Sequence, residues 1–157
     1  MTGRVVIFDL DVTLTRYDTF LPFVAGYVRR RPHHWPGLAA RAVGLLTFWR
    51  WGKRTWVKQA VLRSFLGGER RARVEQRARG YAHRLAESAL REQGLQRLRK
   101  HQCEGDRVIL ATASLDVYVE PLAQLLGIDE VIASRVRWNR RDRLAGIDGE
   151  NCRDWEK

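Results

Sequence analysis

The chain has 157 residues, of which 45% are apolar and 30% are charged, and its formal net charge is +11. This apolar content suffices for a packed core and excludes a low-complexity, disordered protein. The two cysteines, Cys103 and Cys152, provide neither a disulfide framework nor a C-x-x-C metal spacing, so we expect a reducing cytoplasm. The first apolar run begins within a few residues of Met1, and we therefore expect no signal peptide.

The first predicted element is a strand in the segment Val5–Thr15, where an apolar run ends in two carboxylates, Asp9 and Asp11. In an open α/β sheet, loops and helix N-termini converge at the carboxyl end of such a strand, and ligands bind there. Two nearby carboxylates suit Mg²⁺, and one of them could attack phosphorus. The alternative is a strand followed by a turn in which both aspartates only accept hydrogen bonds from backbone N–H groups.

Helical periodicity fills roughly ninety residues after this segment. It predicts four helices, at Asp18–Arg31, Pro36–Trp51, Lys53–Leu66 and Glu69–Gln102. Gly80 and Gly94 are weak points of the last helix, and we expect its part beyond Gly94 to pack on the core and lead into the next strand.

A second apolar strand begins at Arg107 and ends in the hydroxyl residues Thr112 and Ser114. We expect Ser114 to form the N-cap of a helix over Leu115–Leu126. The pattern beyond it predicts a strand at Val131–Ile132 and a hairpin formed by Arg135–Trp138 and Leu144–Ile147, with a basic turn.

The run Phe-Asp-Leu-Asp-x-Thr-Leu-Thr at residues 8–15 resembles motif I of the haloacid dehalogenase-like (HAD) phosphohydrolases, and residues 107–114 resemble motif II. The resemblance implies that Asp9 is the nucleophile, forming an aspartyl-phosphate, and that Asp11 is the general acid and base. It also implies Mg²⁺ held by the Asp9 side chain and the Asp11 backbone carbonyl. Thr112 would bind a phosphoryl oxygen with help from Ser114. We expect Asp9 and Thr13 to converge with Thr112 around one oxyanion.

One departure from motif I is Val12, which stands where the family usually has glycine. A β-branched residue disfavours positive φ, so the turn either keeps a negative φ or is strained.

The segment Asn151–Lys157 resembles the Cys-x-Gly-x-Glu-Lys stretch of motif III in the type IB branch, with Asp154 in place of glycine. The resemblance implies that Lys157 holds the phosphate and the Asp9 carboxylate together, a role that a lysine point charge can fill. Motif IV, which carries the family's remaining Mg²⁺ carboxylates, should follow one strand later. We therefore expect a chain truncated before motif IV, with the strand of Asp9 left as an open edge and with catalysis by this chain in doubt.

The fold implied by the resemblance is α/β. A Rossmann-like core with a parallel sheet, formed by residues 1–15 and 95–157 and incomplete at its C-terminus, would carry an inserted all-helical C1 cap at residues 16–94.

The basic charge is concentrated in the predicted cap. Residues 29–100 contain 19 Lys and Arg against 4 Glu, whereas the remainder contains 10 basic and 14 acidic residues. Four of the six tryptophans lie in the same lobe: Trp35, Trp49, Trp51 and Trp56. Such a lobe attracts anionic partners, including lipid head groups. The plainer alternatives are a genome rich in arginine and helix faces that are merely solvated. No nucleic-acid-reading motif is present, so we expect no nucleic-acid partner.

The order of features in the cap resembles phosphatidylglycerophosphatase C-type and CicA-type members of the type IB branch. This resemblance implies hydrolysis of a phosphate ester at or near the inner face of the cytoplasmic membrane. Phosphoserine phosphatases share the same motifs and act on a soluble metabolite, so that alternative stays open. A third alternative is a catalytically impaired protein that only binds anionic surfaces.

Overall fold

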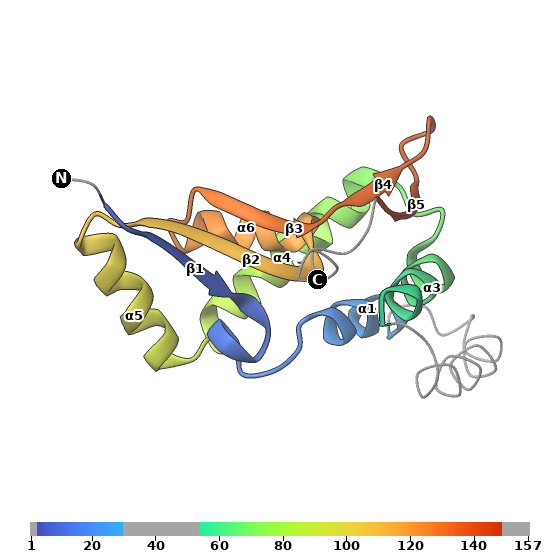
Figure 1. Cartoon of the computed structure of the whole chain (residues 1–157). Helices are drawn as coiled ribbons and strands as arrows, with labels where there is room; N and C mark the ends of the chain where they lie inside the picture. Colours follow the sequence, from blue (N-terminus) through green and yellow to red (C-terminus); the bar gives the residue numbers. More distant parts are fainter. Residues whose placement is uncertain (1–2, 30–53, 149–157) are drawn as a thin grey trace.

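The computed structural model describes residues 3–29 and 54–148. Its first strand, β1 (Val5–Asp9), leads into a five-residue turn, Leu10–Leu14. The elements that follow are α1 (Phe20–Val28), α3 (Arg54–Leu66), α4 (Arg71–Ser88), α5 (Glu92–Cys103), β2 (Arg107–Leu115), α6 (Asp116–Leu125), β3 (Glu130–Ser134), β4 (Val136–Trp138) and β5 (Leu144–Ile147) (Figure 1).

Three strands form a parallel sheet in the order β1-β2-β3. Val5 pairs with Arg107 and Asp9 with Ala111, so the carboxyl end of β1 lies beside the middle of β2. The strands β4 and β5 form a separate antiparallel hairpin at the far end of the molecule from the amino terminus (Figure 1). The parallel sheet with its helical crossovers confirms the α/β class predicted from the sequence.

Strand β1 has no partner on its outer side within the part of the chain that the structure describes. Val5 and Ile7 are 57% and 63% exposed there, whereas Phe8 points into the core. The open edge expected from the sequence is therefore present among these residues. An unpaired apolar edge is a template for pairing with another strand.

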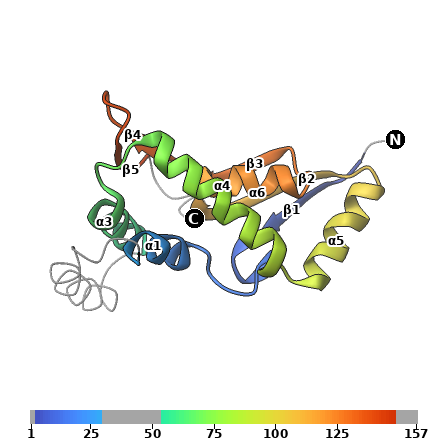
Figure 2. The ribbon, with the colours of Figure 1, turned by 180° about the vertical axis from the view of Figure 1, so that it is seen from behind.

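The core lies between the sheet and the helices behind it. Helix α4 crosses α6 in the view from behind, and the two helices pack against each other (Figure 2). Helix α4 presents buried residues at spacings of three and four, namely Val74, Ala78, Tyr81, Ala82 and Leu85. Helix α6 contributes Tyr118, Val119, Leu122 and Ala123. Burying side chains of this size stabilises the fold by about 1.5–3 kcal/mol each for the larger aliphatic and aromatic ones.

Most predicted elements are found close to their expected bounds. Helix α3 ends at Leu66 as predicted, and the hairpin β4–β5 differs by one residue at its start. Helix α1 begins at Phe20, two residues later than predicted, because the Asp18 carboxylate stands outside the helix and accepts the Phe20 N–H at 3.0 Å. The predicted helix Pro36–Trp51 lies outside the described residues.

The prediction of one long helix over Glu69–Gln102 is wrong, because α4 ends at Ser88 and α5 begins at Glu92. The break falls at neither Gly80 nor Gly94. Backbone pairing with the segment after β1 interrupts the helix: Arg16 N donates to Ala89 O at 2.9 Å, and Arg91 N donates to Leu14 O at 2.8 Å. Leu90, between them, forms an isolated antiparallel bridge with Thr15.

The predicted N-cap role of Ser114 is also wrong. Helix α6 has Leu115 at its N-cap position with no side-chain cap, and the Ser114 hydroxyl points to another partner, described below. The Asp116 carboxylate accepts the N–H of Val117 at the start of this helix and the N–H of Val136 in strand β4. Burial raises the pKa of Asp116, and these two hydrogen bonds partly oppose that shift.

No helix among residues 3–29 and 54–148 combines the length and apolar character needed to cross a bilayer.

Candidate functional site

The candidate site lies where β1 and β2 end. Because Asp9 pairs with Ala111 in the sheet, the residues that follow each of them meet at one edge. Asp9 is exposed and its Oδ2 accepts a hydrogen bond from the Thr13 hydroxyl at 3.1 Å. Within the described residues this is the one hydrogen bond to the Asp9 carboxylate.

The turn Leu10–Leu14 places both aspartates. It is closed by the Thr15 N–H, which donates to Leu10 O at 2.9 Å, while Leu10 and Leu14 are fully buried beneath it. Val12 at its tip has φ 64° and ψ −2° and is 57% exposed. Of the two alternatives left by the sequence, the structure therefore has the strained one, because a β-branched side chain disfavours this left-handed region.

Asp11 is fixed by donors from the start of α1 and from strand β2. Its Oδ1 accepts the Thr19 backbone N–H at 2.8 Å and the Thr19 hydroxyl at 2.7 Å. Its Oδ2 accepts the Ser114 hydroxyl at 2.6 Å. These three contacts exclude the plain alternative in which Asp11 only satisfies the backbone of its own turn.

Behind Asp11 lies a buried network of hydroxyl groups. The Thr19 hydroxyl already donates to Asp11, so the Tyr118 hydroxyl, 3.0 Å away, donates to Thr19 Oγ1. The Tyr81 hydroxyl donates to Thr19 O at 2.9 Å. Burial raises the pKa of both tyrosines, which keeps them protonated as donors. The orientation of Asp11 thus depends on side chains from α4 and α6.

Thr112 is 4% exposed, and its Oγ1 accepts the Ser114 N–H at 3.1 Å. Its own hydroxyl proton has no acceptor among the described residues. Ser114 is fully buried and commits its proton to Asp11, so its contacts orient a carboxylate. The structure thus connects Asp11 with Ser114 directly, and Asp9 with Thr112 through the pairing of their strands.

Lys58 is a residue of this region that sequence reasoning missed. It lies on α3, and its Nζ donates to Ala113 O at 3.2 Å and sits 5.4 Å from the centroid of the Phe20 ring. A single lysine in a basic helix gives no sequence signal for such a contact. No sequence motif assigns a role to Thr19, Tyr81 or Tyr118 either. Lys157 and the rest of the motif III-like segment lie outside the described residues.

Two carboxylates and a buried threonine at the carboxyl edge of a parallel sheet define a hydrolase-type α/β site. The family model described as haloacid dehalogenase-like hydrolase matches residues 6–157. The chain belongs to this family, as its motif I and motif II sequences led us to expect.

Known proteins agree with this placement. Protein CicA of Caulobacter vibrioides is 36% identical over 164 residues, covering 100% of this chain and 73% of CicA. A protein of unknown function from Bordetella pertussis Tohama I has a similar structure, with a TM-score of 0.77 and 21% identity, covering 97% of this chain and 69% of that one. A phosphoserine phosphatase, solved as a phospho-aspartyl intermediate analogue, gives a TM-score of 0.61 at 16% identity, covering 96% and 65%. The CicA match supports the expected CicA-type relationship, and the two structures share the fold.

Proposed function

We propose that this site hydrolyses phosphomonoesters with Asp9 as the nucleophile. The observation that carries the proposal is the contrast between the two aspartates: Asp9 is exposed and one of its oxygens has no hydrogen bond from the residues that the structure describes, whereas hydrogen bonds hold both oxygens of Asp11. An exposed carboxylate can attack phosphorus, and a fixed second carboxyl can manage protons. The structures of phosphoserine phosphatases, one of them titled as a phospho-aspartyl analogue, support the choice of reaction.

The donor set fits Mg²⁺, which prefers hard oxygen ligands and keeps several waters. The Asp9 carboxylate at the sheet edge is exposed and accepts one hydrogen bond from the described part of the chain, so it has room for a further ligand. The side-chain oxygens of Asp11 are already engaged, so its backbone carbonyl is the group left to serve as a ligand. The bound ion would offset the negative charge that the Asp9 carboxylate and the substrate phosphate bring together.

In the first half-reaction an Asp9 oxygen bonds to phosphorus as the bond from phosphorus to the ester oxygen breaks. Asp11 gives a proton to the leaving oxygen, for which it must release a hydrogen bond from Thr19 or Ser114. In the second half-reaction Asp11 takes a proton from water, and that water attacks the phosphoaspartate. Thr112 would donate its free hydroxyl proton to a phosphoryl oxygen, Ser114 would assist chiefly by holding Asp11, and Lys157 would bind the phosphate.

We further propose that the chain consists of a core at residues 1–15 and 95–157, which carries the catalytic aspartates, and a helical cap at residues 16–94. In this scheme the cap reaches the site through Thr19, Lys58 and Tyr81. Lys58 could pair with a negative substituent on the substrate, since it lies against the backbone between Thr112 and Ser114.

For the substrate we propose a head-group phosphate of an anionic phospholipid, reached at the inner face of the cytoplasmic membrane. The supporting feature is an open depression of about 570 Å³ lined by Arg70, Arg71, Ala72, Glu75, Arg141, Asp142 and Arg143. Here the start of α4 meets the β4–β5 turn and brings four arginines together against two acids. Basic residues near an anionic bilayer contribute about 1 kcal/mol each.

The catalytic proposal is tested with para-nitrophenyl phosphate and Mg²⁺. We expect Asp9→Asn to abolish turnover, because an amide oxygen is a poor nucleophile, while the matched change Asp129→Asn on an exposed loop leaves it unchanged. Equal turnover by the protein and by Asp9→Asn would remove Asp9 from the mechanism. Removal of Mg²⁺ by a chelator should stop the reaction in both active proteins.

The lipid proposal is tested by cosedimentation with vesicles of phosphatidylglycerol or of phosphatidylcholine. We expect binding to phosphatidylglycerol only, weakening as salt rises. Arg141→Ala should bind less, and Arg99→Ala, an exposed arginine on α5, should bind almost normally. Indifference to anionic vesicles would favour the second candidate, a soluble phosphorylated metabolite. Vesicle binding without any turnover would favour the impaired, surface-binding protein.

A further inference from the structure

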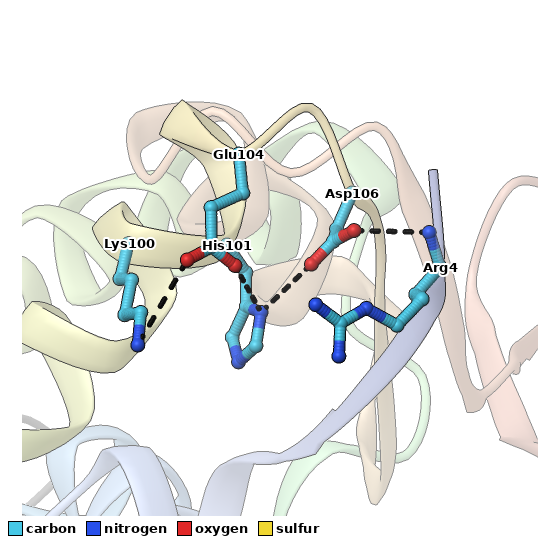
Figure 3. A network of polar contacts seen from close by, with 5 residues as sticks. All are labelled: Arg4, Lys100, His101, Glu104 and Asp106. Carbon is cyan, nitrogen blue, oxygen red and sulfur yellow. Dashed lines mark hydrogen bonds and ion pairs between the residues drawn. The ribbon is translucent and has the colours of Figure 1, made fainter. Parts of the chain in front are cut away.

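Three side chains with metal-binding groups gather at the end of the sheet opposite the candidate site (Figure 3). His101 lies in the last turn of α5, Glu104 follows the helix, and Asp106 precedes β2. One donor atom from each lies within 4.8 Å of the other two. Within the part of the chain that the structure describes, this is the one such group of His, Cys, Asp or Glu residues.

The spacing of the donor atoms suits a small divalent ion. His101 Nδ1 lies 2.9 Å from Asp106 Oδ2 and 3.8 Å from Glu104 Oε2. Tetrahedral zinc with bonds of about 2.0–2.1 Å to nitrogen and oxygen separates its donors by about 3.3 Å. The two separations lie on either side of this value, so movements of about half an ångström would place His101 at zinc-compatible separations from both carboxylates.

The backbone builds this arrangement. Gly105 has φ +75°, a conformation that suits glycine, and the Asp106 N–H donates to His101 O at 3.0 Å as the chain folds back. The Asp106 side chain is 5% exposed, and its Oδ1 accepts the Arg4 N–H of the segment before β1 at 2.9 Å. The Glu104 side chain is 41% exposed and can therefore change its conformation. Two of the three donors are therefore fixed before any ion arrives.

The charges around His101, Glu104 and Asp106 partly favour a bound cation. Two carboxylates can neutralise a divalent ion, and the carbonyl end of α5 adds the negative pole of a helix of 12 residues. Lys100 Nζ competes with a metal ion for the Glu104 carboxylate, because it lies 3.8 Å from Glu104 Oε1. The Arg4 side chain also lies beside the cluster (Figure 3). Ordinary ion pairing thus opposes metal binding here, and this competition can be tested.

We propose that His101, Glu104 and Asp106 form a zinc-binding site with a fourth position open to water. Zinc would replace the hydrogen bond between His101 Nδ1 and Asp106 Oδ2. The Nδ1 proton would leave to solvent, and the ring would keep its other proton on Nε2. Because Asp106 also holds the backbone of Arg4, bound zinc would fasten α5 to the starts of β1 and β2. The site is independent of the proposed phosphatase reaction.

The test uses the full chain, zinc chloride, isothermal titration calorimetry and thermal unfolding. His33 and His34 elsewhere in the chain could bind zinc too. The readout is therefore the difference in the number of zinc ions bound per chain between the original protein and each variant. We expect His101→Asn and Glu104→Gln to bind one zinc ion fewer per chain, or to bind that ion about tenfold or more weakly. His83→Asn, which changes an exposed histidine on α4, should keep it. Circular dichroism establishes that each variant is folded.

A variant that gains affinity separates a metal site from a folding defect. Lys100→Gln removes the ammonium group that competes for Glu104, so zinc should bind it more tightly than it binds the original protein. The proposal is overturned if the unmodified chain binds no zinc in calorimetry, or if His101→Asn and His83→Asn bind it alike.

Discussion

The strained Val12 gives the sharpest prediction for stability. Its φ of 64° lies in the left-handed region, which costs a residue with a Cβ roughly 1–2 kcal/mol. Glycine removes that strain but loses about 0.5–1 kcal/mol more conformational entropy on folding. The Val12 side chain is 57% exposed, so its removal sacrifices little burial. The two terms differ by between 0 and about 1.5 kcal/mol, and from the middle of that range we expect Val12→Gly to raise the free energy of unfolding by roughly 0.5–1 kcal/mol.

The assay is thermal and urea unfolding followed by circular dichroism. A gain of 1 kcal/mol corresponds to about 2–4 °C in a chain of this size. Asp142, with φ 51°, is the matched control, because aspartate tolerates this region better and Asp142→Gly should gain less. If Val12→Gly unfolds at the same or a lower temperature, or if Asp142→Gly gains equally, the strain argument is refuted.

Two further predictions concern the core and the amino-terminal end of the sheet. Leu110→Ala, at a fully buried position of β2, should cost about 2–5 kcal/mol in urea unfolding, whereas Leu125→Ala, 46% exposed, should cost much less. The His101 and Arg4 hydrogen bonds lower the pKa of Asp106, so the stability they provide is present above the ordinary aspartate pKa of about 3.9 and is lost as pH falls through the lower folded value. Acid titration of unfolding should therefore show a shallower loss for Asp106→Asn, and identical curves would contradict this.

Local patterns predicted the elements well where local rules govern them. Helix α3 ends where Gly67-Gly68 begins, and the strands β1 and β2 follow the apolar runs that end in Asp9 and Thr112. The long helix failed because its interruption near Leu90 depends on partners some 75 residues away in sequence, at Leu14 and Thr15. Periodicity within a segment cannot report such pairing.

The candidate site, like the fold, could be predicted from the sequence only in part. The motif around Asp9 and Asp11 was visible in the sequence because both carboxylates follow one apolar strand. The contact of Ser114 with Asp11 was not visible, because an N-cap is the default interpretation of a serine before a helix, and here the Ser114 hydroxyl donates to the Asp11 carboxylate instead. Lys58 and Tyr118 reach the site only through the packing of α3 and α6.

The sequence by itself determined the family of this protein, the order of its elements and the two aspartates at its candidate site. These features depend on short runs of residues, whose periodicity and spacing are written in the chain. The tertiary structure decided the positive φ of Val12, the hydroxyl network behind Asp11, the arginine depression and the corner of His101, Glu104 and Asp106. Each of these depends on backbone closure or on side chains brought together by packing, because burial and hydrogen bonding across elements are properties of the folded chain alone.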